Sequence, residues 1–463
     1  MRPNVLLIVL DTARADAFEP YGGGVGASPV VGDLARRGAA LPLAYSPSNW
    51  TLPSHVAMLS GLLPRQSGLA QVPGGKAGNC KPYVEALERL LVPSVLRRAG
   101  YETRAVSANA WISATTGFAA GFDEFRDVRS DRKKPPPPRP RLKAARWLLD
   151  GARAHTDDGA AAAEEVLNTW IEQPRDKPFF WLVNLVECHS PYLPPRPYND
   201  IKGRARFEAA EDVRRYQTLS AVWRTCAGGQ PIAADALARM RHLYGRSIRA
   251  LDDWLGRLLE RLDAARILDD TLVIVTSDHG ENLGEANMIG HAFSLSETLI
   301  HVPLIVSGPG AFSNGRVCSL ASLPRRIAAA LDLSEHPWGS ADEERVVVSQ
   351  YDALTTPDDP RVAHAAHDWG LDDVGIAVLT SRGTSATDGR FKLVRERGAD
   401  LLYDVRADPL ETSPISSNGD VEHLRTALGD ADRQTPVISP TAASTSAEEN
   451  AELEERLKLL GYL

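Results

Sequence analysis

Short apolar runs alternate with amphipathic segments along the chain up to about residue 330. The runs are apolar at nearly every position rather than at every second one, which is typical of parallel strands covered on both faces. They predict strands at Val5–Leu10, Ala105–Ser107, Phe179–Val186, Leu272–Thr276 and Leu304–Val306. Helical periodicity predicts helices between them, from Ser28-Pro29 to Gly38 and over Val84–Arg98, Ala160–Ile171, Ala234–Leu262 and Leu323–Leu331. This order predicts a doubly wound α/β domain.

The pattern changes after residue 340, so we expect a large domain over residues 1–340 and a small C-terminal domain over residues 341–463. The small domain is predicted to contain antiparallel strands at Arg345–Gln350, Gly375–Thr380 and Phe391–Arg395, a mobile Ser/Thr/Pro-rich segment over residues 412–446, and a terminal helix, Ala447–Leu460. A basic, proline-rich segment over residues 126–146 predicts a linker or exposed loop. A nucleic-acid contact there is disfavoured because interleaved aromatic residues are missing.

The composition is that of an ordinary globular protein of 463 residues, with 43% hydrophobic and 24% charged residues. The net charge of −8 is spread along the chain and argues against nucleic-acid binding, which needs a clustered basic face. Four cysteines without a Cys-x-x-Cys pair are not a disulfide framework. The apolar run Val5–Leu10 is too short for a signal peptide or a membrane span, and no window approaches twenty apolar residues. We therefore expect a cytoplasmic protein without membrane contact.

Candidate ligands follow the predicted strands, and ligands of open α/β sheets bind at the carboxyl ends of strands. Asp11 follows the first strand, His189 the third, and Asp278 and His279 the fourth. Asp11, Asp278 and His279 offer oxygen and nitrogen donors suited to one divalent cation. The alternative for each residue taken singly is a cap on the next helix.

A second candidate is the segment around Thr51. Pro53 fits only an early helical position, so a helix is predicted up to Ser60 with Gly61 as its stop. Thr51 would then lie just before a helix N-terminus, where an anion is favoured. Beside a cation, a hydroxyl at this place can ionise and attack, although a routine capping role is the alternative.

These motifs resemble those of the sulfatase family in the alkaline phosphatase superfamily. The resemblance covers nearly the whole chain and rests on Asn4–Asp16, Thr51–Pro64, Gly121–Phe125, Glu187–Tyr192, Ser277–Glu281, Gly290-His291, Val302–Ile305, Leu402–Asp404, Asp408-Pro409 and Glu411. It implies a mostly parallel, alkaline-phosphatase-like α/β sheet between helices as the catalytic domain, followed by a small α+β domain.

One departure from the family pattern concerns the nucleophile. Family sulfatases carry Cys-x-Pro-x-Arg, whose cysteine is oxidised to formylglycine, whereas this chain has Thr51-Leu52-Pro53-Ser54-His55. Threonine cannot become an aldehyde, because its β-carbon already bears a methyl group. Thr51 matches instead the threonine nucleophile of the superfamily's phosphodiesterases and phosphotransferases.

Other departures concern charge. The family's Asp-Asp pair is Asp11-Thr12 here, and the Gly-Lys-Trp-His region reads Val106–Trp111 without its Lys and His. His291 stands where many sulfatases place a substrate-binding lysine. The resemblance therefore implies a less cationic pocket, which suits a singly charged diester better than a dianionic monoester.

The combined expectation is a metal-dependent hydrolase of phosphate-type or sulfate esters, acting on a small anionic substrate. One cation (Mn, Mg, Ca or Zn) would be held by Asp11, Asp278 and His279 with Thr51 as fourth ligand. No second His/Asp cluster occurs in the motifs, and Asp252 and Asp253 lie in a helical stretch where packing or solvation is expected.

Thr51 would attack and form a covalent intermediate, with His55 orienting it. His189 and His291 would bind the non-bridging oxygens or protonate the leaving group, and Asn109 is a candidate substrate ligand. A phospho- or sulfo-group transferase, a sulfuric ester hydrolase without formylglycine, and a non-catalytic anion binder stay open as alternatives, as do the leaving group and the oligomeric state.

Overall fold

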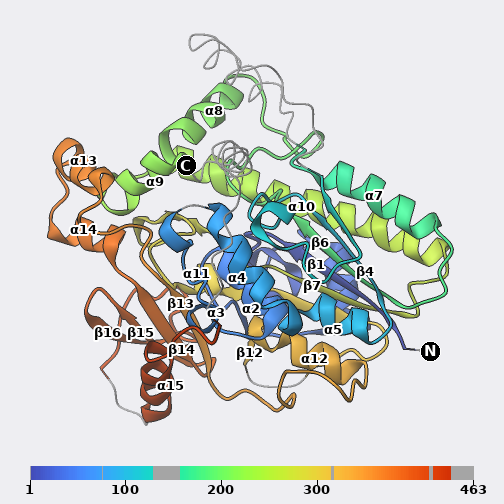
Figure 1. Ribbon diagram of the computed structural model, residues 1–463. Coiled ribbons are helices and arrows are strands. Elements are labelled where there is room, and N and C mark those ends of the chain that lie inside the picture. Colours follow the sequence, from blue (N-terminus) through green and yellow to red (C-terminus); the bar gives the residue numbers. More distant parts are fainter. Residues whose placement is uncertain (1, 76, 129–156, 314–316, 417–420, 439–463) are drawn as a thin grey trace.

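A seven-stranded sheet forms the centre of the computed structural model (Figure 1), which describes residues 2–75, 77–128, 157–313, 317–416 and 421–438. Its strand order is β2-β11-β7-β1-β6-β4-β5. The parallel strands are β1 (Asn4–Leu10), β4 (Glu102–Ser107), β5 (Glu124–Asp127), β6 (Phe179–Leu185) and β7 (Thr271–Thr276). The prediction was wrong in one respect: β11 (Leu304–Ser307) pairs antiparallel with β7 and with the short edge strand β2 (Ala39–Ala40).

Helices cover both faces of this sheet, as the uninterrupted apolar strands predict. Alternate residues of β1 enter two separate cores, Val5, Leu7 and Val9 on one face and Leu6, Ile8 and Leu10 on the other. The first core is closed by α2 (Thr51–Ser60), α4 (Lys81–Ala86), α5 (Val92–Arg98) and α12 (Leu323–Ala330). The second is closed by α1 (Pro29–Arg37), α7 (Ala160–Glu172), α8 (Arg204–Tyr216) and α10 (Ala234–Ala264).

The longest of these helices, α10, shows how sequence sets packing. Its buried positions include Leu251, Leu255, Leu258 and Leu262, a spacing that places them on one face. Asp252 is buried beside them, and its carboxylate accepts hydrogen bonds from the main-chain N–H groups of residues 30 and 31 at the start of α1 (3.1 and 2.9 Å). No helix within the described ranges is both long and apolar enough to cross a bilayer.

The helix predicted over Val84–Arg98 is broken. The chain leaves α4 at Ala86, passes through a 3₁₀ turn and begins α5 at Val92. Pro93 explains the break, because proline lacks the N–H that an interior helical turn needs and restricts the residue before it.

A small antiparallel sheet follows the large domain and contains β13 (Val347–Tyr351), β14 (Gly383–Thr387), β15 (Phe391–Glu396) and β16 (Ala399–Asp404). Helix α15 (Glu422–Asp432) packs on it through Leu424 and Leu428. This helix lies inside the segment predicted to be mobile, so that prediction was wrong for its residues. The predicted terminal helix, Ala447–Leu460, and residues 129–146 of the basic segment lie outside the described residues.

Gly375–Thr380, predicted as a strand, is part of a helix, α14 (Asp373–Thr380). Asp372 precedes this helix, and its side chain accepts a hydrogen bond from the N–H of Gly375 at 2.9 Å. This N-cap favours a helical start, which outweighs the apolar, strand-like run that follows. The remaining elements are α3 (Pro64–Ser67), α9 (Leu219–Cys226), α11 (Glu297–Ile300), α13 (Pro360–Trp369), β3 (Ala44–Tyr45), β8 (Asn282–Leu283), β9 (Ile289–Gly290), β10 (His301–Val302) and β12 (Cys318–Ser319).

Ion pairs of two buried cations, Arg65 and Lys392, join the small sheet to the large domain. Arg65 of α3 is 7% exposed and reaches Asp352 and Asp432, each at 3.0 Å. Lys392 of β15 is fully buried and lies 3.1 Å from Glu297 and 2.9 Å from Glu411. Because removing one partner of a buried pair leaves an uncompensated charge, these contacts fix the relative position of the two sheets.

Candidate active site

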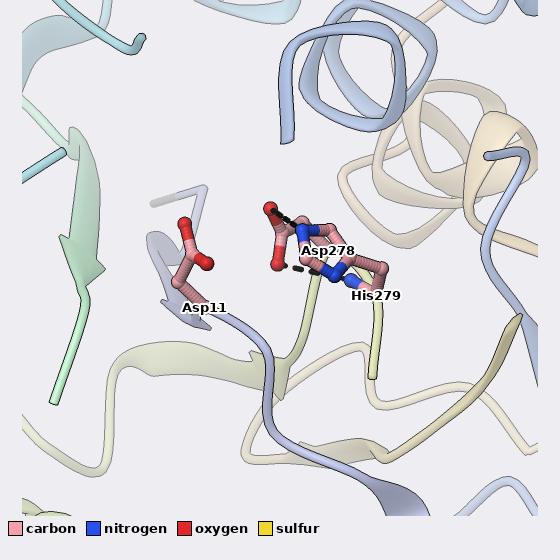
Figure 2. Close-up of side chains that lie close together, drawn as sticks. All are labelled: Asp11, Asp278 and His279. Atoms are coloured by element: carbon pink, nitrogen blue, oxygen red, sulfur yellow. Dashed lines mark hydrogen bonds and ion pairs between the residues drawn. The ribbon is translucent and has the colours of Figure 1, made fainter. Parts of the chain in front are cut away.

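Asp11, Asp278 and His279 meet at the carboxyl edge of the large sheet (Figure 2). Asp11 follows β1, and the other two follow β7, its parallel neighbour, in which Thr276 pairs with Val9. One donor atom of each lies within 4.8 Å of the others, and all three side chains are fully buried. Within the described ranges no other group of three acidic, His or Cys side chains comes this close.

Both carboxylates keep one oxygen without a hydrogen-bond partner. Oδ1 of Asp278 accepts from the main-chain N–H of Thr12 at 3.2 Å and of His279 at 2.9 Å, while Oδ2 accepts none. Oδ2 of Asp11 accepts from Asn109 at 2.5 Å, while Oδ1 accepts none. Burying such oxygens without a donor is unfavourable, so a cation is the natural complement.

The imidazole of His279 is prepared to donate a lone pair. Its Nδ1–H donates to the carbonyl oxygen of Gly280 at 2.9 Å, which leaves Nε2 unprotonated and facing Thr51 Oγ1 at 3.3 Å. Burial lowers the pKa of His279 to about 4 and keeps the ring neutral. Residue 280 must be glycine, because a Cβ there would collide with the carbonyl oxygen of Thr298.

The electrostatics of the pair Asp11 and Asp278 also favour a bound cation. Burial and the neighbouring Asp278 carboxylate raise the pKa of Asp11 well above its ordinary value. A divalent cation would remove this penalty, since it compensates both charges. Two carboxylates and a neutral imidazole therefore fit one divalent cation.

Thr51 is fully buried and is the first residue of α2, with Trp50 in the capping position. The prediction placed it one step earlier, outside the helix; in the structure it belongs to the first turn, where main-chain N–H groups lack intrahelical acceptors. Ser54 is one turn away, and its hydroxyl contacts Ser46 Oγ at 2.9 Å and the carbonyl of Ser48 at 3.2 Å. Ser54 is therefore already engaged, whereas Thr51 faces His279.

His55 also lies on α2, one turn after Thr51. Its Nδ1–H donates to the carbonyl oxygen of Thr51 at 3.0 Å and lies 3.4 Å from Oδ2 of Asp278. Burial lowers the pKa of His55, so the ring is neutral near pH 7. These contacts connect His55 to the Thr51 main chain and to one predicted cation ligand.

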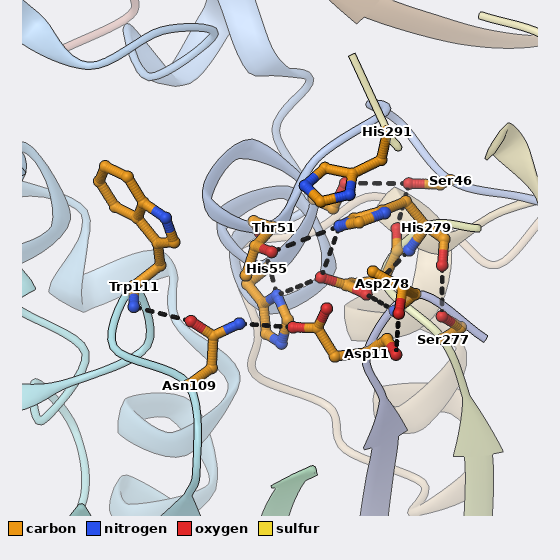
Figure 3. A network of polar contacts seen from close by, with 12 residues as sticks. Asp11, Ser46, Thr51, His55, Asn109, Trp111, Ser277, Asp278, His279 and His291 are labelled. Carbon is orange, nitrogen blue, oxygen red and sulfur yellow. Dashed lines mark hydrogen bonds and ion pairs between the residues drawn. The ribbon is translucent and has the colours of Figure 1, made fainter. Parts of the chain in front are cut away.

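The ring of His291 lies 4.6 Å from that of His279 (Figure 3). The ring of His189 lies 5.0 Å from that of His291. Nδ1 of His189 donates to the carbonyl oxygen of Ser190 at 2.7 Å. Nδ1 of His291 lies 3.2 Å from Oε1 of Glu281, which is fully buried. Glu281 was part of a quoted motif, but its contact with His291 had no sequence signal.

Both polar atoms of the Asn109 side-chain amide form hydrogen bonds within the protein. Nδ2 donates to Asp11, and Oδ1 accepts from the main-chain N–H of Trp111 at 2.8 Å (Figure 3). This geometry favours a role in positioning Asp11, and the predicted substrate contact stays a prediction.

Thr12, at the position where the resemblance implies a second aspartate, uses its hydroxyl in a hydrogen bond to the main chain. Its hydroxyl donates to the carbonyl oxygen of Asp11 at 2.7 Å. Its φ of 59° lies in the left-handed region, which is costly for a β-branched residue. This turn lets the main-chain N–H of Thr12 donate a hydrogen bond to Oδ1 of Asp278.

A pocket of about 200 Å³ opens beside His189 and His291. Its wall includes Trp50, Trp111 and Trp223, which come from distant parts of the chain. No sequence pattern connects these three residues, and none of them directly follows a predicted strand.

A mostly parallel sheet between two helical layers, with this polar group at its carboxyl edge, defines an alkaline-phosphatase-like α/β protein. The family model described as Sulfatase matches residues 3–334, and the chain belongs to this family.

Curated and solved proteins agree with this assignment. The chain is 22% identical over 460 residues to choline-sulfatase of Rhizobium meliloti, covering 90% of this chain and 83% of that protein. It is 23% identical to iduronate 2-sulfatase of Homo sapiens, covering 73% of this chain and 64% of that one. The solved phosphonate monoester hydrolase of Agrobacterium radiobacter has a similar fold, with a TM-score of 0.63, 22% identity and coverage of 93% and 94%.

Proposed function

We propose that this protein is a hydrolase of phosphate-type esters that uses Thr51 as nucleophile and one divalent cation. The matched family, with relatives named as sulfatases and a phosphonate monoester hydrolase, supports the hydrolysis of sulfate or phosphorus esters. The position of Thr51 is the observation that supports this residue as the nucleophile. Its buried hydroxyl at a helix start lies 3.3 Å from His279 Nε2, beside carboxylate oxygens without hydrogen-bond partners.

Asp11 Oδ1, Asp278 Oδ2, His279 Nε2 and Thr51 Oγ1 would hold the cation. When bound, such a cation lowers the pKa of a coordinated hydroxyl and stabilises negative charge on the substrate. Asn109 and His55 would keep these donors in place through their contacts with Asp11, Asp278 and the main chain of Thr51.

The reaction would proceed in two displacements. Thr51 Oγ releases its proton to solvent and forms a bond to phosphorus while the bond to the leaving oxygen breaks, and a protonated His189 or His291 gives its proton to that oxygen. Water then attacks phosphorus and gives a proton to the same histidine, the bond to Thr51 Oγ breaks, and Thr51 takes a proton back from solvent. The net products are an alcohol or phenol and the phosphorus acid.

The cysteines support threonine as nucleophile. Burial raises the pKa of Cys80 and Cys226 to about 12 and that of Cys318 to about 11, and it also raises the pKa of Cys188. All four are therefore thiols near neutral pH, and a thiolate is needed for attack.

A substrate panel tests the proposal. Aryl phosphate monoesters, phosphodiesters, phosphonate monoesters and sulfates with one common leaving group would be assayed with Mn²⁺, Mg²⁺, Ca²⁺ and Zn²⁺. We expect sustained turnover of a phosphorus ester that stops on chelation. Faster sustained turnover of the sulfate would support a sulfuric ester hydrolase instead, and products formed only with an added alcohol or amine would support a transferase.

A further inference from the structure

His189 and His291 both line the pocket, and the ring of His291 lies 4.6 Å from that of His279, so the pocket opens beside the candidate cation ligands. Trp50, the residue before Thr51, lines the same pocket. An ester held at Thr51 would therefore direct one substituent past the histidines into this pocket.

Aromatic side chains form much of its wall. The rings of Trp50 and Trp111 meet edge to face, with centroids 5.5 Å apart and an interplanar angle of 82°. Trp223 and Phe293 do so at 6.4 Å and 76°. All four residues are 8% exposed or less, so packing holds their rings in place. Rigid rings of this kind favour flat, apolar ligands.

Asp352 and Arg361, two charged residues of the pocket wall, each have an oppositely charged partner. Asp352 accepts from Arg65 at 3.0 Å, and Arg361 donates to Asp359 at 2.7 Å. The guanidinium of Arg361 also lies over the ring of Trp223, 5.7 Å from its centroid. A quaternary ammonium group binds to free aromatic faces, and the face of Trp223 is already covered by the Arg361 cation. This face is therefore not open to a cationic leaving group.

We propose that this pocket, lined by Trp50, Trp111, Trp223 and Phe293, selects esters with an uncharged aromatic leaving group. The inference rests on the proposed function, because the ester must lie at Thr51. Leu219, the first residue of α9, also lines the pocket and offers a site for a specific test.

Binding of phosphonates separates recognition from catalysis, because their P–C bond is not cleaved by the proposed reaction. Calorimetry on the full-length protein supplied with Mn²⁺ would compare phenylphosphonate, ethylphosphonate and (2-trimethylammonioethyl)phosphonate. We expect phenylphosphonate to bind about tenfold or more tightly than either of the others, because its ring buries more apolar surface.

Leu219→Glu places a carboxylate in the wall, and an acidic residue at the start of a helix is well tolerated. We expect this variant to lose most of the preference for the phenyl group. Leu410→Glu is the matched control, since Leu410 is 51% exposed and does not line this pocket. It should keep the preference.

The outcomes are distinct. Equal affinity for phenyl- and ethylphosphonate, tighter binding of the ammonium compound, or an unchanged preference in Leu219→Glu overturns the aromatic selectivity while leaving the hydrolase proposal intact. If none of the three compounds binds, the proposed anion site itself is wrong, and this inference fails with it.

Discussion

Asn109 donates from Nδ2 to Oδ2 of Asp11 over 2.5 Å, and this bond leaves Oδ1 of Asp11 as the carboxylate oxygen without a hydrogen-bond partner. We expect Asn109→Ala to weaken metal affinity about ten- to hundredfold, as the loss of a hydrogen bond to a metal ligand typically does. Metal titration measures this. Unchanged metal affinity with a raised KM would instead assign Asn109 to the substrate.

Thr51→Ala should lower kcat by several orders of magnitude, because the attacking oxygen is lost. The free energy of unfolding should fall by only about 1 kcal/mol, the usual contribution of one hydroxyl hydrogen bond. Thr51→Ser should keep part of the activity. Ser54→Ala is the control and should remain active, since that hydroxyl contacts Ser46 and the Ser48 carbonyl. Normal turnover by Thr51→Ala would refute the nucleophile assignment.

Sulfate esters should give one turnover and then stall. A formylglycine hydrate releases sulfate by expelling it from a geminal diol, whereas a sulfated Thr51 is an alkyl sulfate that needs attack at sulfur. A phosphorylated Thr51 can be cleaved by in-line attack of water at phosphorus. Stopped-flow assays on matched aryl esters would show a stoichiometric burst with the sulfate and a linear phase with the phosphorus ester. A linear sulfate phase of equal rate contradicts this.

His189→Ala and His291→Ala distinguish the proton donor. Loss of a general acid should slow esters with poor leaving groups about 10²- to 10⁴-fold and esters with good leaving groups much less. A histidine that binds only the non-bridging oxygens should slow both equally. The slope of log kcat/KM against leaving-group pKa, measured for each variant, decides between the two roles.

Glu187 should make stability depend on pH. Its Oε1 accepts from the N–H of Ala160 at the start of α7, 2.7 Å away, and burial with the charges of Asp158 and Asp157 raises its pKa to about 8. The folded state then binds this proton more tightly than the unfolded state. Stability is therefore lost as pH rises from the usual value near 4.5 towards 8.

The matched variant for this effect is Glu187→Gln, which cannot ionise. The free energy of unfolding of this variant should depend less on pH in that window. The change with pH should be smaller than in the unmodified protein by up to about 4 kcal/mol. If the melting temperatures of the two proteins change equally with pH between 5 and 8, Glu187 is ionised in the folded state and the prediction is wrong.

The close approach of Asp11, Asp278 and His279 could be predicted from the sequence because it depends on where individual strands end, whereas their role as cation ligands stays a prediction. Asp11 and Asp278 each end an apolar strand, and adjacent parallel strands bring their carboxyl ends together. The direction of β11 could not be predicted, since a run of three apolar residues, Leu304–Val306, is equally compatible with parallel and antiparallel pairing. The domain boundary at residue 340 stays a prediction.

The wall of the pocket could not be predicted, because it forms only in the folded chain. Trp50 precedes α2, Trp111 follows β4 and Trp223 lies in α9, so no spacing relates them. The contact between Glu281 and His291 depends in the same way on the turn between β8 and β9.

The large sheet carries Asp11, Asp278 and His279, whereas Tyr351, Leu354 and Arg361 of the pocket wall come from the end of β13 and the start of α13. Part of the proposed recognition wall thus comes from a stretch of sequence separate from the strand ends that carry Asp11, Asp278 and His279. We expect substitutions at Leu354 or Arg361 to change which esters the proposed pocket accepts while leaving Asp11, Asp278 and His279 in place. A library limited to Leu219 and the segment after β13 is therefore an economical starting point for evolving new substrate range in this scaffold.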